Sequence, residues 1–269
     1  MLGKFGYQAT RAAQNSVDAV TKSMENVSNM YSLGYKKSQA SFVETLSGEI
    51  EKKETRDFSQ GALRKTGEVY DLALEGPGFF EVEMQNGQRA YTRVGKFSLT
   101  SEGELVTDEG YKVIPENESS GKPVLEIATN DSNELVNIKV TTQKLTIPTN
   151  LTPQVDEDGT VYGLNAVTGE KAKIGKINVV AFNNSQGLES LGRSCYLPTK
   201  SSGPALDIET GPSGNTRVKQ GFIEFSNVTM AQEFMNMSQL KNLLAAQFKV
   251  LKIMDKIYEN VHYTISRST

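Results

Sequence analysis

Apolar residues recur at helical spacing near the N-terminus of the chain. They follow one another at alternating steps of four and three residues, and polar residues such as Gln14, Asp18 and Lys22 fill the positions between them. This heptad spacing is typical of an amphipathic helix that packs against another helix. Gly34 and the basic residues after it indicate that the helix ends near that point. The predicted seam consists of Ala13, Val17, Val20, Met24, Val27 and Tyr31.

The C-terminal part of the chain repeats this pattern from residue 230 onward, without an interrupting proline. Thr229 and Gln232 have the spacing of a capping box, which places the start of the helix. At 1.5 Å per residue we expect a helix on the order of 50 Å long. Its seam positions are Phe234, Met237, Leu244, Phe248, Leu251 and Tyr258.

Between these helices the sequence changes to short runs of alternating apolar and polar residues. Residues 79–84, 90–94 and 176–182 are examples, and Asn86-Gly87 between the first two predicts a tight hairpin. We expect Phe79, Phe80, Tyr91 and Phe97 to supply the core of this small β domain. Glycines expected at its turns, some at positive φ, are Gly76, Gly78, Gly87, Gly95, Gly103 and Gly110.

The sequence therefore predicts an α+β fold, in which long N- and C-terminal coiled-coil-type helices flank a central all-β domain. We expect two intervening segments to be extended or mobile, because they are weakly periodic and polar. Whether the helices bury their stripes against each other, on the β domain or against other copies is left open by periodicity. The predicted organisation is an N-terminal helix in 1–46, a linker in 47–67, the β domain in 68–198, a Gly/Ser/Pro-rich stretch in 199–219, and a C-terminal helix pairing with the N-terminal region in 220–269.

Composition and charge narrow the possible functions. The 269 residues carry a net charge of −3, and no segment concentrates positive charge, which argues against nucleic-acid binding. No apolar run approaches the roughly 18 residues that span a bilayer. The first residues lack the apolar stretch of a secretory signal peptide, so none is expected. Cys195 is the only cysteine, which excludes an internal disulfide.

Candidates for catalysis or metal binding are few. His262 is the only histidine, and no G-x-S-x-G elbow accompanies it. Residues 156–159, Asp-Glu-Asp-Gly, lack the later glycine and closing glutamate of a calcium loop and predict a turn instead. The glycine-rich segments 76–78 and 211–214 lack the lysine of a phosphate-binding loop. We therefore expect no enzymatic activity, no metal and no cofactor.

Residues 26–36, 66–107 and 220–228 carry motifs that together resemble those of the flagellar rod and hook protein family. Residues 26–36, NVSNMYSLGYK, resemble its N-terminal signature N-[IL]-A-N-x-N-T-x-G-[YF]-K. Residues 66–107 resemble its TG…LDLAIEGxGFFxV, YTRxGxF and GxLVT blocks, and residues 220–228, QGFIEFSNV, are similar to QGxLExSNV. The family's Q-R-A-Y-E stretch is replaced by K-N-L-L-A at 241–245, where leucines offer apolar packing. Matching positions include Asn26, Asn29, Gly34, Tyr35, Lys36, Gly76, Gly78, Phe79, Phe80, Gln220, Gly221, Ser226 and Asn227.

This resemblance implies a structural subunit of the bacterial flagellar basal-body rod in the cell envelope. By the same resemblance, the flagellar secretion apparatus exports the subunit without a cleaved signal, and the subunit polymerises helically through its terminal helices. Its implied partners are further copies of itself, other rod and hook proteins and the export apparatus, with no nucleic acid and no direct membrane span. The short link between the first helix and the TG…LDLA block favours a proximal-rod-like member. A distal-rod protein, or a soluble binding module that uses the same β domain, remains an alternative.

Overall fold

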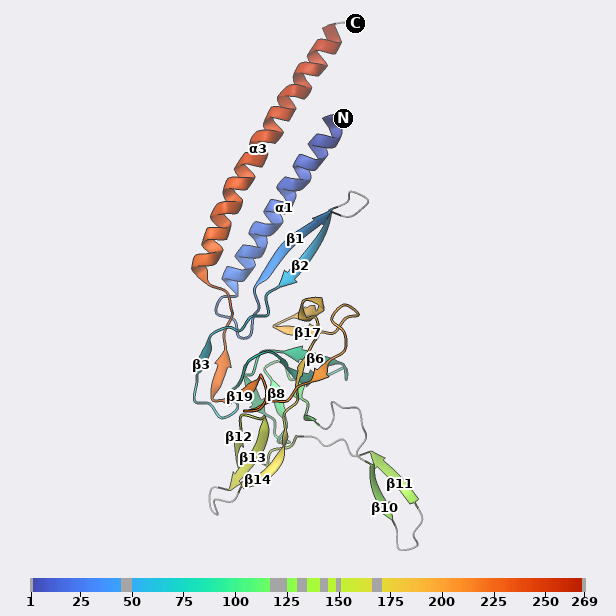
Figure 1. The fold of residues 1–269 in the computed structure, drawn as a ribbon, viewed down its shortest axis with the longest axis vertical. Coiled ribbons are helices and arrows are strands. Elements are labelled where there is room, and N and C mark those ends of the chain that lie inside the picture. The colour runs from blue at the N-terminus through green and yellow to red at the C-terminus, as the bar shows by residue number, and fades with distance from the viewer. Residues whose placement is uncertain are drawn as a thin grey trace. The chain divides into compact units, whose positions relative to one another are not determined.

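The computed structural model describes residues 2–44, 50–116, 125–129, 135–140, 145–148, 151–165 and 171–267 (Figure 1). The chain forms two compact units, and both are discontinuous in sequence. Unit 1 comprises Met1–Tyr31, Lys37–Asp57 and Val228–Thr269, and unit 2 comprises Ser32–Lys36 and Phe58–Asn227.

Unit 1 contains both terminal helices and one hairpin. Helix α1 (Leu2–Ser28) packs along α3 (Met230–Arg267) and against strand β1. The buried positions on α1 include the small residues Ala13, Ser16 and Ser23. Strand β1 (Ser38–Glu44) pairs antiparallel with β2 (Ile50–Arg56).

This hairpin differs from the predicted organisation. The predicted organisation assigned 1–46 to the N-terminal helix, ending near Gly34, and 47–67 to a linker. In the structure α1 ends at Ser28, and residues 38–56 include two paired strands. A mostly polar two-stranded ribbon gives little apolar alternation, so its hydrogen-bonded register leaves no clear periodic signal in the sequence.

Unit 2 is built around a nine-stranded sheet. Seven of its strands follow the order β16-β17-β6-β5-β9-β8-β7, and β15 pairs with both β5 and β18. The strand pairs of this sheet are antiparallel, and short hairpins connect several neighbours in sequence. The strands are β5 (Phe79–Glu83), β6 (Arg89–Thr92), β7 (Phe97–Leu99), β8 (Leu105–Thr107), β9 (Lys112–Val113), β15 (Val179–Ala181), β16 (Glu189–Gly192), β17 (Cys195–Leu197) and β18 (Leu206–Asp207).

Smaller sheets complete unit 2, and two of them join segments far apart in sequence. Strand β4 pairs with β19, and β3 pairs with β20. Because β18 and β19 fall in the Gly/Ser/Pro-rich stretch, that stretch is part of the β structure and not the free linker that its composition predicted. The elements are β3 (Leu63–Lys65), β4 (Leu72–Glu75), β10 (Leu125–Thr129), β11 (Leu135–Val140), β12 (Leu151–Val155), β13 (Thr160–Asn165), β14 (Lys171–Lys176), the 3-10 turn η1 (Ser185–Gly187), β19 (Arg217–Gln220) and β20 (Phe222–Glu224).

Aromatic side chains form much of the core of unit 2, as the sequence predicted. Phe80 and Phe97 meet edge to face with ring centroids 5.3 Å apart in the larger apolar cluster. Phe79 and Tyr91 belong to a second cluster, in which each contacts Phe182 in the same geometry. Such edge-to-face ring contacts stabilise the fold beyond the effect of the apolar area that they bury.

The predicted hairpin at Asn86-Gly87 connects β5 to β6. Gly87 has φ 76°, its N–H donates to Met84 O at 2.9 Å, and the Asn86 side chain accepts from the N–H of Gln88. Gly95 is needed for a different reason, because it is not at positive φ. A Cβ there would lie 1.5 Å from the carbonyl oxygen of Leu72, so close backbone approach requires glycine.

Candidate functional site

The structure divides the predicted helical seam into two sets. One set is buried or half-buried on the sides of α1 and α3 that pack within unit 1. Gly6 on α1 faces this side of α3, since a Cβ there would lie 3.7 Å from Met254 Cε. The set comprises Ala13, Val20, Val27, Met237, Leu244 and Leu251.

The other half of the predicted seam is exposed. On α1, Val17 and Met24 lie seven residues apart and therefore on the same side of the helix, and 41% and 58% of their surfaces are exposed. Tyr31, which follows α1, is 73% exposed. The corresponding exposed residues of α3 are Phe234, Phe248 and Tyr258.

A second apolar stripe on α3 escaped the sequence analysis. Its members repeat at helical spacing on a side of α3 that α1 leaves uncovered, and each is between 43% and 58% exposed. The signal was present in the sequence, because these residues recur at helical spacing and give α3 a second apolar side. The α3 stripe consists of Met235, Leu243, Val250, Ile253 and Ile257.

Asn26 and Asn29 of the first motif have local structural roles in unit 1. The buried Asn26 side chain donates to Ser38 O at 2.8 Å and accepts from Ser38 N–H at 3.0 Å, which fixes the start of β1 against α1. Asn29 donates to Glu25 O at 2.9 Å beyond the last turn of α1. Beside Asn26, the buried carboxylate of Glu233 at the start of α3 pairs with Lys37 at 2.7 Å.

Three motif segments meet in a buried ion network in unit 2. Glu224 of the third motif lies 2.8 Å from Lys36 Nζ of the first and 3.0 Å from Arg93 Nε of the second. Lys36 also donates to Ser59 O at 2.6 Å, and Gly61 N–H donates to Glu224 Oε1 at 2.8 Å. Burial lowers the pKa of Arg93, and the carboxylate of Glu224 opposes this shift.

Other motif residues hold the segments in place around this network. Arg93 Nη1 donates to Gly76 O at 2.9 Å and to Gly78 O at 2.7 Å, so one guanidinium fixes the glycine turn before β5. Gly34 N–H donates to Glu224 O at 2.8 Å. Asn227 N–H donates to Tyr35 O at 3.4 Å. Of the remaining motif positions, Gln220 is half-buried, and Gly221 and Ser226 are buried.

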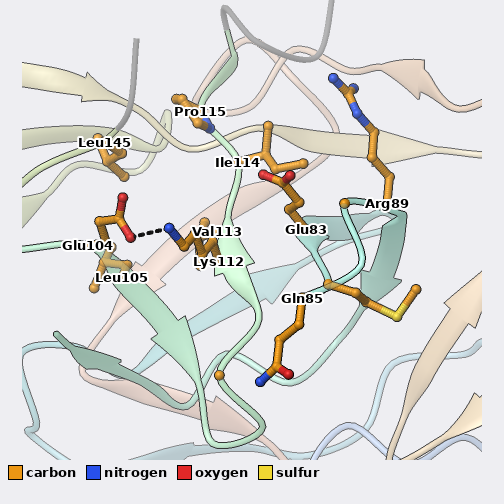
Figure 2. Close-up of a pocket in the computed structure, with 13 residues that line it drawn as sticks. Glu83, Gln85, Arg89, Glu104, Leu105, Lys112, Val113, Ile114, Pro115 and Leu145 are labelled. Carbon is orange, nitrogen blue, oxygen red and sulfur yellow. Dashed lines mark ion pairs between the residues drawn. The ribbon is translucent and has the colours of Figure 1, made fainter. Parts of the chain in front are cut away.

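The pocket of unit 2 that lies beside β8 and β9 offers no catalytic set among the described residues. It has a volume of about 540 Å³, and none of its lining residues is Ser, Cys or His. Figure 2 shows Lys112 beside Glu104, to which it is paired at 2.6 Å. The hydrogen bond to Glu104 raises the pKa of Lys112, so this amine stays protonated at neutral pH and cannot act as a base.

The other candidates from the sequence also have structural explanations. Burial raises the pKa of Cys195 to about 11, so its thiol is protonated and unreactive at neutral pH. Residues 156–159 form the predicted turn, in which Gly159 N–H donates to Asp156 O at 2.9 Å. The His262 side chain lies outside the described residues. Within the described ranges, no group of three or more potential ligands gathers around a metal position, and no helix is long and apolar enough to cross a membrane.

Two family models match the chain. Residues 73–163 match the flagellar hook protein FlgE/F/G D1 domain, and residues 219–261 match the flagellar basal body rod FlgEFG protein C-terminal domain. A flagellar basal-body rod protein FlgG from Buchnera aphidicola subsp. Schizaphis graminum is 33% identical over 204 residues, which is 76% of this chain and 68% of the relative. The chain belongs to the flagellar basal-body rod protein family.

Further members of the rod family extend this similarity. The FlgG protein of Bacillus subtilis is 27% identical over 280 residues, covering 95% of this chain and 96% of the relative. The FlgF rod protein of Caulobacter vibrioides is 30% identical over 213 residues, which is 79% of this chain and 71% of the relative. The rod family is structural and not enzymatic, and the chain is a structural subunit of the basal-body rod. The FlgG matches support a distal-rod-like subunit and correct the proximal-rod-like expectation, which rested on the length of one linker.

Proposed function

We propose that this distal-rod-like subunit polymerises helically through its two terminal helices, which pair in coiled-coil fashion within unit 1. The observation that carries the proposal is the exposed α3 stripe. A helix that is already packed on one side and presents a second apolar side to water gains free energy when another protein surface covers that side.

The size of the stripe favours many neighbours over a single partner. Fully burying a Leu, Ile, Met or Phe side chain contributes about 1.5–3 kcal/mol, and the stripe residues are already about half-buried. The five residues would therefore contribute roughly 4–8 kcal/mol. Association costs an estimated 4–15 kcal/mol, so one such contact is marginal. A subunit with several neighbours in a helical lattice meets this cost, and a heterologous contact propagates as a tube.

The proposal includes export through the flagellar secretion apparatus, a place on the periplasmic side of the envelope, and contacts with other rod and hook proteins. Family membership supports these elements, because a rod subunit has to reach the basal body and join its other components.

Substitution of Ile253 by Asp tests the assembly surface directly. The new charge lies on the exposed stripe and not on the side that packs against α1, so we expect the subunit to fold normally and to fail to join the rod. The measurements are circular dichroism of the purified variant and its recovery by mass spectrometry in isolated hook–basal bodies from cells that carry it.

Ser238→Asp is the matched control, because Ser238 is an exposed polar residue of the same helix and the substitution adds the same charge. It should assemble and support motility. Leu244→Asp and Val20→Asp are less discriminating, since these positions are half-buried within unit 1 and their substitution disturbs the helix pair as well. Recovery of Ile253→Asp in basal bodies at the level of Ser238→Asp would contradict the proposal.

A further inference from the structure

The last segment of unit 2 in sequence, residues 217–227, completes structure laid down at the start of that unit. We call it the closing segment. Its strand β19 is the partner of β4 and its strand β20 is the partner of β3. Val218, 1% exposed, lies in the main core cluster with residues of the central sheet. Without this segment, strands β3 and β4 lose these partners and the core loses a buried side chain.

Hydrogen bonds from the closing segment reach other parts of unit 2. The Gln220 amide donates to Val69 O at 2.9 Å and to Pro153 O at 3.0 Å, and it accepts from Val155 N–H at 3.1 Å. Gly221 N–H donates to Asp71 O at 2.7 Å. These contacts join the region before β4 to strand β12, which lies far along the chain.

Buried ion pairs make unit 2 depend further on the closing segment. Glu224 supplies the carboxylate for two buried cations, since the Lys36 side chain is fully buried and that of Arg93 is 3% exposed. A chain without the closing segment would have to bury both cations without the Glu224 carboxylate, and removing one partner of a buried ion pair costs several kcal/mol. Lys36 precedes the β1–β2 hairpin and Arg93 directly follows β6, so the two cations lie in different parts of the sequence.

We infer that the closing segment controls the folding of unit 2, so that the central sheet does not form stably until residues 217–227 dock. In a chain made from its N-terminus, unit 2 then stays unfolded until everything except the region of α3 has been synthesised. The physical reason is that pairing distant segments costs chain entropy, and here the contacts that offset this cost form only when the final strands dock. A subunit that must be threaded before it folds would benefit, but the inference concerns folding and does not depend on the proposed assembly.

Pulse-labelled hydrogen exchange during refolding of the full-length chain from urea tests this order. Reporter amides of the closing segment are Val218, Gly221 and Phe225. Those of the central sheet are Met84 and Ile114, which directly follow strands β5 and β9, and all five amides donate backbone hydrogen bonds. If docking controls folding, both sets gain protection in one phase, with rates within about twofold. Protection of Met84 and Ile114 about tenfold earlier would overturn the inference.

Val218→Ala provides a second test that should leave the chain able to fold. It weakens docking of the closing segment without changing any residue of the central strands, so the refolding rates of both amide sets should fall together by about threefold or more. Glu102→Gln, at an exposed position, is the control and should leave both rates unchanged. An unaltered central-sheet rate in Val218→Ala, with only the closing segment slowed, would also overturn the inference.

Discussion

The buried ion network makes a quantitative prediction for Glu224→Gln. The substitution keeps the shape of the side chain and an oxygen that can accept from Gly61 N–H, but it removes the carboxylate that pairs with both Lys36 and Arg93. Breaking a buried ion pair by removing one partner costs about 3–5 kcal/mol. Because small proteins are stable by only about 5–15 kcal/mol, this loss is a large part of the total.

Urea unfolding of the full chain measures this cost. The protein has no tryptophan, so tyrosine fluorescence and far-UV circular dichroism are the probes, and Tyr91 and Tyr196 lie in the core of unit 2. With a urea dependence of about 2–3 kcal/mol per M, the unfolding midpoint should fall by roughly 1–2.5 M. The slope should be unchanged, because the surface exposed on unfolding is the same.

A double-mutant cycle with Lys36→Met separates the charge effect from lost packing. Lys36→Met removes one of the two cations, so the combination with Glu224→Gln should be less destabilised than the sum of the single variants, by about 1–3 kcal/mol. Additive effects, or a cost of Glu224→Gln below about 1 kcal/mol, would refute the view that paired buried charge holds these segments together.

The remaining predictions concern titration and backbone packing. Burial raises the pKa of Cys195 from 9.0 to about 11, so the folded state should lose stability as the pH rises from about 9 towards 11, by roughly 1–2 kcal/mol. Urea unfolding at pH 8 to 10 should show this slope in the natural protein and a weaker one in Cys195→Ala. Gly95→Ala should lower the free energy of unfolding by about 3 kcal/mol, because the added Cβ would collide with the carbonyl oxygen of Leu72. Relieving this collision would also disturb the hydrogen bond that Leu72 N–H donates to Gly95 O. By contrast, Gly6→Ala should raise the free energy of unfolding by about 0.5–1 kcal/mol in thermal unfolding, because Gly6 lies within α1 and the added Cβ would make ordinary contacts. Equal losses of stability in the two alanine variants would contradict this explanation.

Local patterns in the sequence were sufficient for much of the fold. Heptad spacing predicted the two terminal helices, because a helix repeats its exposed and buried sides every few residues. Asn86-Gly87 predicted the β5–β6 hairpin, and the aromatic residues around it predicted the core. The motifs identified the family, but they did not distinguish its members: the length of residues 47–67 favoured a proximal-rod-like subunit, whereas the FlgG relatives support a distal-rod-like one.

Other features could not be predicted because they depend on contacts between distant segments. The β1–β2 hairpin has little apolar alternation, and the pairing of β18 and β19 contradicts the linker-like composition of their sequence. The predicted seam mixed inward and exposed residues, since spacing reports that residues share a side of a helix but not what that side contacts.

The sequence by itself determined the helices, the turns and the apolar residues available to a core, because these follow from backbone sterics and short-range periodicity. Only the tertiary structure decided which apolar stripe of α3 remains exposed and that Lys36, Arg93 and Glu224 share one buried site. The physical reason is that burial and ion pairing are properties of atoms brought together in space. A carboxylate and two cations separated by long stretches of chain carry no local signal of their meeting.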